Sequence, residues 1–268
     1  MSISKFGFIG CGNMGGSLAR AVCKAVGSND VLLADKATDK ALLLTDELKC
    51  NCGDVKDIAE GCKYIFLGVK PQGMKNALDE ISNILKERND RYILISMAAG
   101  IDIANFKSML GFECPIIRIM PNTPVSAGEG MIVYSYNKNV SEEEIEEFNN
   151  ALQFAGKLDK IDEGLINSAT AVSGCGPAFV YLFAEAMADA GVDCGLPREK
   201  ALEYAFQTIT GAAKLMQTSG KLPSVLRDEV CSPGGSTIEG VHALEDNNFR
   251  DVVKLAIKAS FDKTNKLN

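Results

Sequence analysis

Short apolar runs alternate with stretches of helical periodicity along the first part of the chain, from residue 5 to about residue 162. The runs are mostly continuous Ile, Val, Leu and Phe, which is typical of strands covered on both faces. Because a turn and then a helical pattern follow each run, this part predicts an α/β fold. The predicted strands are residues 5–10, 30–34, 64–69, 92–96, 116–120, 131–136 and 158–161.

Strand patterns stop near residue 165, and Ala-rich helical segments separated by Gly and Pro residues follow. This change predicts an all-helical second part. Ser141 followed by Glu144 predicts a capping box that opens the last helix of the first part, which we expect to run to about Ala155. No linker rich in Pro, Gly or Ser separates the parts, so we expect two closely joined domains, residues 1–162 and 163–268.

Composition limits the possible partners. The chain of 268 residues has 28 Lys and Arg against 35 Asp and Glu, a formal net charge of −7. It therefore has no general attraction to nucleic acid or to an anionic membrane, and any phosphate site must be local. Residues 165–184 are uncharged and long enough to span a bilayer, but Asn, Ser, Thr, Gly and Pro interrupt them, and we interpret them as buried protein.

The N-terminal residues bear on where the protein is located, and the cysteines bear on disulfide formation and metal binding. Glycines interrupt the first apolar residues, unlike the apolar region of a secretory signal, which favours the cytoplasm. Nine cysteines are an odd number in a large chain, so we expect them to be reduced and buried. The closest pair, Cys50 and Cys52, has no second Cys or His pair at zinc-binding spacing, and we predict no metal site.

A glycine-rich segment follows the first apolar run and leads into helical periodicity. Its residues are Gly10, Cys11, Gly12, Asn13, Met14 and Gly15. The spacing G-x-G-x-x-G between a strand and a helix is typical of dinucleotide binding. The first glycine permits the tight turn, the second lets a pyrophosphate approach the backbone, and the third lets the helix lie close to the sheet. Unpaired N–H groups at the start of the helix then face the phosphates.

An acidic residue stands where such folds recognise the adenosine ribose. Asp35 closes the second predicted strand, 20 positions after Gly15, and its carboxylate can accept hydrogen bonds from ribose hydroxyls, which favours NAD. Lys36 beside it can receive a 2′-phosphate instead, so the phosphate state of the cofactor stays open. The alternative for both residues is an ordinary turn after a strand.

Three further segments leave the predicted strands at the edge where open α/β sheets bind ligands. They contain Val69, Lys70 and Pro71, then Ala98, Ala99 and Gly100, then Asn122. The small residues 98–100 would let a flat ring lie on the backbone, and Asn122 can hydrogen-bond a carboxamide. Each segment alone is equally compatible with simple turn chemistry.

The helical part contains a second glycine-rich segment before a helix. Its chemistry is carried by Ser232, Gly234, Gly235, Ser236 and Thr237. Two glycines leave the backbone uncovered and two hydroxyls stand where unpaired N–H groups begin a helix, so the segment is a candidate pocket for a small carboxylate. The alternative is a capped helix without ligand. His242, the single histidine, lies on a different face of that helix, and we favour a structural role for it.

Taken together, these segments resemble pyrroline-5-carboxylate reductases, most strongly over residues 226–245, and the likeness extends in order over essentially the whole chain. The resemblance implies a Rossmann domain, a helical C-terminal domain that forms an intertwined homodimer, and larger assemblies of dimers in many members. It also implies reduction of 1-pyrroline-5-carboxylate to L-proline by NAD(P)H. The glycine loop, Lys70 and residues 98–100 would then meet the cofactor, and residues 232–237 the substrate.

The resemblance suggests a catalytic role for Thr237. Hydride delivery to a cyclic imine needs mainly positioning, together with a hydrogen bond to the ring nitrogen, for which Thr237 is the candidate. Protonation of the substrate before binding would make a stronger acid unnecessary. Two positions depart from the family pattern: Asp35 stands where NADPH-preferring members have a small hydroxyl or basic residue, and Val55 stands near a position that is often Asn. We therefore expect NADH to be used at least comparably to NADPH.

Two other functions compete with this interpretation. A β-hydroxyacid dehydrogenase has a similar domain order but uses a lysine base on the long interdomain helix, and residues 165–184 contain no lysine. A nucleotide sensor would bind NAD(P) without turning over a substrate.

The oligomeric state is predicted independently of the function. The apolar stripes on residues 179–190 and 201–216 exceed what one small helical bundle can bury, which predicts at least a dimer.

Overall fold

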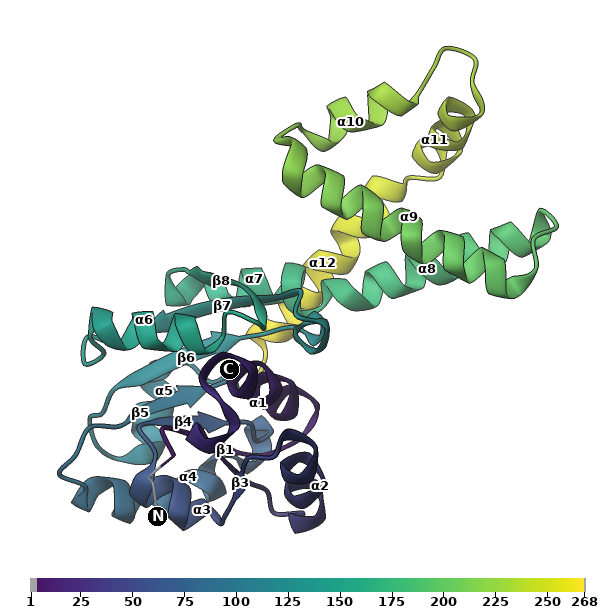
Figure 1. Ribbon diagram of the computed structural model, residues 1–268. Helices are drawn as coiled ribbons and strands as arrows, with labels where there is room; N and C mark the ends of the chain where they lie inside the picture. The colour runs from purple at the N-terminus through teal and green to yellow at the C-terminus, as the bar shows by residue number, and fades with distance from the viewer. Residues whose placement is uncertain (1–3, 268) are drawn as a thin grey trace. The chain divides into compact units, whose positions relative to one another are not determined.

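The computed structural model describes residues 4–267, which form one sheet and a series of helices (Figure 1). The strands are β1 Phe6–Ile9, β2 Val31–Ala34, β3 Asn51–Cys52, β4 Tyr64–Leu67, β5 Ile93–Ser96, β6 Ile116–Met120, β7 Gly130–Tyr136 and β8 Gly156–Lys160. The α-helices are α1 Asn13–Val26, α2 Thr38–Leu48, α3 Val55–Gly61, α4 Pro71–Glu87, α5 Ile103–Leu110, α6 Glu142–Ala151, α7 Ile166–Ala169, α8 Gly176–Asp193, α9 Arg198–Ser219, α10 Pro223–Val230, α11 Ser236–Asp246 and α12 Phe249–Asn265. Short 3₁₀ turns cover Ser28–Asp30, Thr123–Ala127 and Glu163–Leu165, and Thr170–Gly174 is a π-helix.

The sheet has the strand order of a dinucleotide-binding fold. It is 8-stranded, in the order β3-β2-β1-β4-β5-β6-β7-β8, and its pairs are parallel except β6 with β7. The chain order reverses between β1 and β4, and ligands of open α/β sheets bind at the carboxyl ends of strands at such a point. Every predicted run overlaps a strand, although β7 begins one residue and β8 two residues before the predicted run. β3 was missed because its two residues are exposed and carry no apolar pattern.

Helices cover both faces of the sheet (Figure 1). Apolar residues of α1, α2 and α6 pack on one face, and those of α3, α4 and α5 pack on the other. In the centre, the rings of Phe8 on β1 and Phe66 on β4 stack with centroids 4.4 Å apart. These central strands are therefore buried on both faces, which explains their continuous apolar runs.

The predicted capping box is confirmed at the start of α6. The Ser141 hydroxyl accepts the Glu144 backbone N–H, and the Glu144 carboxylate accepts the Ser141 N–H. α6 ends at Ala151 rather than at about Ala155, because the backbone N–H groups of Leu152 and Ala155 turn back to close a short loop before β8.

Both edges of the sheet are poorly suited to pairing with another strand. β3 has only two residues. β8 forms the other edge, pairs with β7 on one side and carries the exposed charged residues Lys157, Asp159 and Lys160.

The chain divides into two compact units, residues 1–174 with 260–268, and residues 175–259. The predicted boundary near residue 163 does not coincide with this division, although the second part is all-helical as predicted. The reason is local packing: Ile166 of α7 is fully buried against Met120 and Val133 of the sheet. The last residues of α12 also belong to the first unit.

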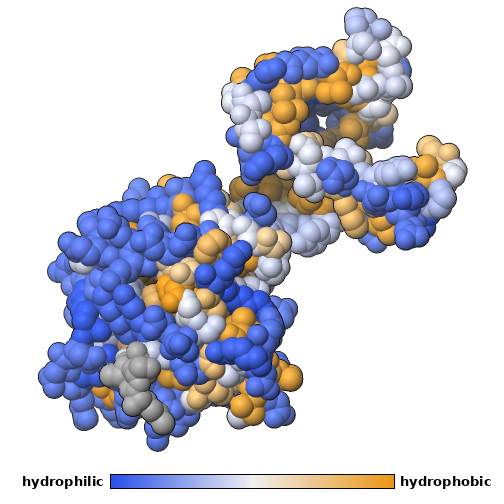
Figure 2. All heavy atoms as spheres, in the orientation of Figure 1, coloured by the Kyte–Doolittle hydropathy of each residue, from blue (hydrophilic) through white to orange (hydrophobic). Residues whose placement is uncertain are grey.

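The second unit consists of helices whose apolar residues are widely exposed. α8 packs on α9 through Ala188, Ala201 and Ala205, whereas Leu182 and Phe206 are exposed. In Figure 2, hydrophobic residues gather at the surface of these helices. The helical stretch Glu163–Asp193 is long and apolar enough to cross a membrane, and only 17% of its most apolar window is buried in the single chain. Within residues 165–184, which the sequence predicts to be buried, only Ile166, Thr170, Ala171 and Ala184 are buried in the single chain.

All nine cysteines are free in the structure, and fewer of them are buried than the sequence analysis predicts. Only Cys23, Cys62 and Cys114 are buried, while Cys52 and Cys194 are exposed. Among residues 4–267, no group of three or more His, Cys, Asp or Glu side chains is arranged to hold a metal ion.

Candidate functional site

The glycine loop adopts the geometry that its sequence predicts. Gly10 has φ +105°, a left-handed conformation that favours glycine. A Cβ on Gly15 would lie 2.1 Å from the carbonyl oxygen of Gly10, and a Cβ on Gly68, at the end of β4, would lie 2.8 Å from the same atom. These contacts bring the start of α1 against the ends of β1 and β4.

Gly12 faces open space. A Cβ built on this residue meets nothing within 4 Å, and the residue is exposed. Gly12 is also the N-cap of α1, where no described side chain caps the helix. Backbone N–H groups of the first turn are therefore available to an anion beside a glycine that leaves room for it. This combination fits the pyrophosphate of a dinucleotide.

Asp35 lies next to this loop. Its carboxylate accepts the backbone N–H of Cys11 at 2.6 Å and that of Ala37 at 2.8 Å. Lys36 is exposed. Burial, with a further contribution from the Asp35 charge, raises the pKa of the Cys11 thiol to about 12, so this thiol is neutral and not a nucleophile.

A hollow of about 280 Å³ opens beside the loop, and it contains residues that the sequence did not single out. Its lining is Cys11, Gly12, Asn13, Arg20, Lys40, Leu43, Leu44 and Glu47. Arg20 and Glu47 form a two-pronged ion pair across α1 and α2, with both N···O distances 2.7 Å. Arg20 and Glu47 are 27 positions apart, so no local sequence pattern predicts that they pair. Only the packing of the two helices brings them together. The hollow has both apolar and polar walls and is suited to a nucleoside.

The segment after β4 forms the start of a helix. Lys70 is the N-cap of α4 and Pro71 occupies the first turn. Val69 is partly buried, whereas Lys70 and Pro71 are exposed. No side chain among the described residues forms an ion pair with Lys70. Its ammonium group is thus available at the same edge of the sheet as the glycine loop.

The segment after β5 is a turn with almost no side chains. Ala98 and Gly100 are buried and Ala99 is partly buried. The backbone N–H of Ile101 reaches the carbonyl of Ala98 at 3.5 Å, which closes the turn before α5.

Asn122, after β6, is used by the protein itself. Its Oδ1 accepts the backbone N–H of Met131 at 2.8 Å, and its Nδ2 donates to the carbonyl of Ser173 at 2.9 Å. The side chain is 8% exposed. The Asn122 side chain therefore joins β7 to the π-helix. Only the second N–H of its Nδ2 and the second lone pair of its Oδ1 are left to contact a carboxamide.

The second glycine-rich segment lies in the other unit and begins α11. Gly235 is the N-cap, and no described side chain caps the helix. Gly234 has φ +69°, and the Gly235 backbone N–H donates to the carbonyl of Ser232 at 3.0 Å. Ser236 and Thr237 occupy the first turn and are exposed.

The start of α11 bears on the alternative that Thr237 is only a helix cap. Because Gly235 is the cap, the Thr237 hydroxyl does not close the helix end and stays available beside unpaired N–H groups. His242 lies further along α11, exposed, with Nδ1 3.9 Å from Glu239.

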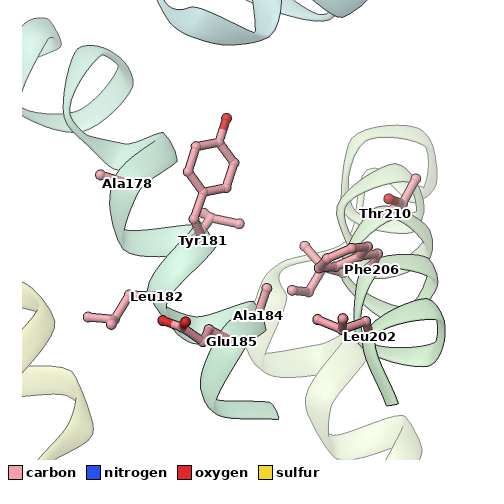
Figure 3. Close-up of a pocket in the computed structure, with 10 residues that line it drawn as sticks. Ala178, Tyr181, Leu182, Ala184, Glu185, Leu202, Phe206 and Thr210 are labelled. Carbon is pink, nitrogen blue, oxygen red and sulfur yellow. The ribbon is translucent and has the colours of Figure 1, made fainter. Parts of the chain in front are cut away.

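A larger apolar hollow of about 800 Å³ lies between α8 and α9 (Figure 3). Ala178, Tyr181 and Ala184 border it from α8, and Leu202 and Phe206 border it from α9. Glu185 is its only charged lining residue. Its other polar lining residues are Tyr181 and Thr210, no lining residue is basic, and the mainly apolar lining resembles an unfilled helix interface.

Family models match both parts of the chain. The model described as pyrroline-5-carboxylate reductase dimerisation matches residues 163–267. The model described as NADP oxidoreductase, coenzyme F420-dependent, matches residues 5–100. The second part of this chain is thus similar to a dimerisation domain, which accounts for the exposed apolar residues of α8 and α9.

Curated relatives are similar over the full length. The pyrroline-5-carboxylate reductase of Escherichia coli (strain K12) is 37% identical over 98% of this chain and 98% of its own. The Arabidopsis thaliana enzyme is 36% identical over 98% of this chain and 95% of its own. Among solved structures, the Plasmodium falciparum pyrroline carboxylate reductase with NADP bound is 33% identical with a TM-score of 0.88, covering 100% of this chain and 99% of that one. The Coxiella burnetii enzyme is 28% identical with a TM-score of 0.90, covering 99% of both chains.

Proposed function

This chain belongs to the pyrroline-5-carboxylate reductase family, and from that premise we propose how its residues carry out the reaction of the family. It reduces 1-pyrroline-5-carboxylate to L-proline with NAD(P)H, the final step of proline biosynthesis. When bound, NAD(P)H supplies the hydride for the imine carbon, and the ring nitrogen takes a proton. The protein must hold both molecules and provide a hydrogen bond at that nitrogen.

The dinucleotide is held by the glycine loop and its neighbours. We assign the pyrophosphate to the open space at Gly12 and the uncapped N–H groups of α1. The hollow beside the glycine loop receives the adenosine, and we assign its ribose to Asp35 and Lys36. The nicotinamide half meets the segments after β4, β5 and β6. The cofactor residues so assigned are Gly10, Cys11, Gly12, Asn13, Met14, Gly15, Asp35, Lys36, Val69, Lys70, Pro71, Ala98, Ala99, Gly100 and Asn122.

The substrate carboxylate is assigned to the start of α11. Unpaired N–H groups at an uncapped helix start favour an anion, so no arginine is needed. The residues assigned are Ser232, Gly234, Gly235, Ser236 and Thr237. Thr237 is the catalytic candidate, because its exposed hydroxyl can donate a hydrogen bond to the ring nitrogen. It orients that nitrogen, and a substrate that is already protonated needs no stronger acid.

Dimerisation follows from the matched domain, and we further propose that dimers associate into larger assemblies. The hollow between α8 and α9 would receive apolar side chains of a second copy of this chain. A cytoplasmic location is a prediction from the sequence.

The observation that carries the function is the full-length similarity together with a glycine loop whose geometry fits a pyrophosphate. The test is the oxidation of NADH and of NADPH at 340 nm with 1-pyrroline-5-carboxylate as the only acceptor. We expect turnover that requires the imine, and proline as product. Binding of NAD(P)H without oxidation would indicate a nucleotide sensor, and oxidation of a β-hydroxyacid by NAD(P)⁺ would indicate the competing dehydrogenase.

A further inference from the structure

The turn between β5 and α5 is held from two sides by residues from the opposite ends of the helical region 163–267. Ala98, Ala99 and Gly100 have small side chains or none, and the buried side chains of Ala98 and Ile101 anchor the turn in the core of this unit. Two residues from outside the turn also contact it, Glu163 and Leu267, and both belong to the same compact unit as the turn.

Leu267 packs directly on Gly100. Gly100 has φ +78°, and a Cβ placed on it would lie 2.8 Å from both the Cβ and the carbonyl oxygen of Leu267. The contact therefore requires a glycine at this position, for its conformation and for the space. The segment that carries Leu267 is itself fixed: Thr264 is buried, and Asn265 Oδ1 accepts a hydrogen bond from Asn167 Nδ2 at 2.9 Å.

Glu163 holds the other end of the turn. Its Oε1 accepts the backbone N–H of Ile103, the first residue of α5, at 2.7 Å. The same oxygen pairs with Arg118 Nη1 at 3.1 Å. Arg118 is 3% exposed on β6, and its Nη2 has no hydrogen-bond partner in the described part of the chain. Since a buried guanidinium without a counter-ion is costly, Glu163 is constrained to this place.

We propose that Glu163 and Leu267 are positioning residues for hydride transfer: they fix the 98–103 turn so that its backbone supports the nicotinamide half of the cofactor. This inference rests on the proposed cofactor contact at residues 98–100. It assigns to the two ends of the dimerisation region a role in the nucleotide-binding unit. Neither residue needs to touch the reacting atoms.

The test compares a complete cofactor with a fragment that lacks nicotinamide. Leu267→Gly, which removes the Cβ that contacts Gly100, and Glu163→Ala are measured for kcat, for KM of the preferred reduced cofactor, and for the dissociation constants of that cofactor and of its fragment. The fragment is ADP-ribose for NADH or its 2′-phosphate for NADPH. Because small displacements at a reacting centre are costly, we expect kcat to fall by about tenfold and the cofactor to bind several-fold more weakly, with fragment binding unchanged.

Matched controls separate positioning from general loosening. Leu42→Ala removes a leucine that is 47% exposed on α2, against 53% for Leu267, and should leave the kinetics unchanged. Glu147→Gln removes an ion-paired carboxylate remote from the turn and should lower only stability. Leu267→Ala keeps the Cβ that contacts Gly100 and should recover most of the turnover lost in Leu267→Gly.

Each remaining outcome has one meaning. Unchanged kcat in both Leu267→Gly and Glu163→Ala, or equal weakening of cofactor and fragment, would overturn the positioning role. If Glu163→Ala does not fold, Leu267→Gly decides, since Leu267 is half exposed and lies beyond the end of α12. A wild-type protein that binds NAD(P)H but does not reduce the imine would refute the proposed function, while the comparison of cofactor with fragment would still test the turn.

Discussion

The Asp35 carboxylate holds the backbone N–H of Cys11, 24 positions earlier in the chain, with Oδ2 2.6 Å from the nitrogen. One side chain therefore supports the glycine loop and occupies the position to which we assign the adenosine ribose. We expect the wild-type enzyme to use NADH at least as well as NADPH, because the negative charge repels a 2′-phosphate unless Lys36 offsets it.

Asp35→Ser should remove that charge and both hydrogen bonds to the backbone. We expect kcat/KM for NADH to fall by about tenfold, with a smaller change for NADPH. Asp35→Asn keeps an oxygen that can accept a backbone hydrogen bond but carries no charge. It therefore separates the effect of the charge from the effect of supporting the glycine loop. A wild-type enzyme with kcat/KM overwhelmingly in favour of NADPH would contradict this assignment of Asp35.

Gly12→Val should abolish cofactor binding and leave the fold intact. The space around Gly12 is empty in the structure, so valine fits the protein but occupies the place assigned to the pyrophosphate. Calorimetric titration with NAD(P)H measures the affinity, and circular dichroism checks the fold. Gly15→Ala is the contrasting variant, because its Cβ would lie 2.1 Å from the Gly10 carbonyl oxygen and should destabilise the protein itself. Normal affinity in Gly12→Val would exclude this loop as the dinucleotide site.

Thr237→Ala should lower turnover by about tenfold or more while NAD(P)H affinity is preserved. Because Gly235 rather than Thr237 caps α11, the melting temperature should hardly change, with a stability change within about 0.5 kcal/mol. Thr237→Ser keeps the hydroxyl and should recover much of the activity. A fully active Thr237→Ala would leave only the backbone of this segment and the protonation of the substrate to account for catalysis.

The stability of the first unit should depend on Glu147 at low pH. Burial raises the pKa of Glu147, but hydrogen bonds from Lys63, Tyr64 and Lys5 outweigh it and lower that pKa to about 2 from the ordinary 4.5. A lowered carboxylate pKa stabilises the folded state above pH 4.5, and the gain is lost as the pH falls toward 2. Glu147→Gln should therefore lower the urea midpoint at pH 7, and the difference from wild type should shrink between pH 4.5 and 2. A difference that is constant over this range would show that the charge of Glu147 contributes nothing.

Phe206→Asp should break the dimer. Phe206 is exposed and borders the apolar hollow between α8 and α9, where a carboxylate would be desolvated by a second copy. Light scattering at micromolar concentration should give a dimer or larger mass for the wild type and a monomer for the variant. Leu42→Asp, which is exposed on α2 outside the dimerisation region, should keep the wild-type mass. A monomeric wild type would exclude assembly through this surface.

The fold was largely predictable because its signals are local. Gly10 predicted a tight turn, Gly12 an open space beside the backbone and Gly15 a close packing of the helix on the sheet, and the structure has each of these features. β3 was not predictable, because Asn51 and Cys52 are held by pairing to β2 rather than by an apolar pattern. The reversed direction of β7 was hidden as well, since a hydrophobic run looks the same in either direction.

The missed contacts depend on residues far apart in the chain. Arg118 and Glu163 are separated by 45 positions and meet only after folding. A signal was nevertheless present: a charged residue inside the apolar run 116–120 must find a partner if the strand is buried on both faces. Asn122 shows that a polar side chain at the end of a strand need not be reserved for a ligand. The sequence favoured a ligand contact for Asn122, whereas in the structure its side chain hydrogen-bonds to Met131 and Ser173.

The two edges of the sheet have a consequence for solubility. β3 is too short to template another strand, and the charges of β8 disfavour the close approach of a second edge. Sheets from neighbouring molecules therefore have no favourable register in which to join, even at the high concentrations reached during overexpression. The chain therefore associates with itself through its helices rather than through strand pairing. A dimer is a closed assembly, whereas strand pairing between sheet edges can continue without limit and form aggregates.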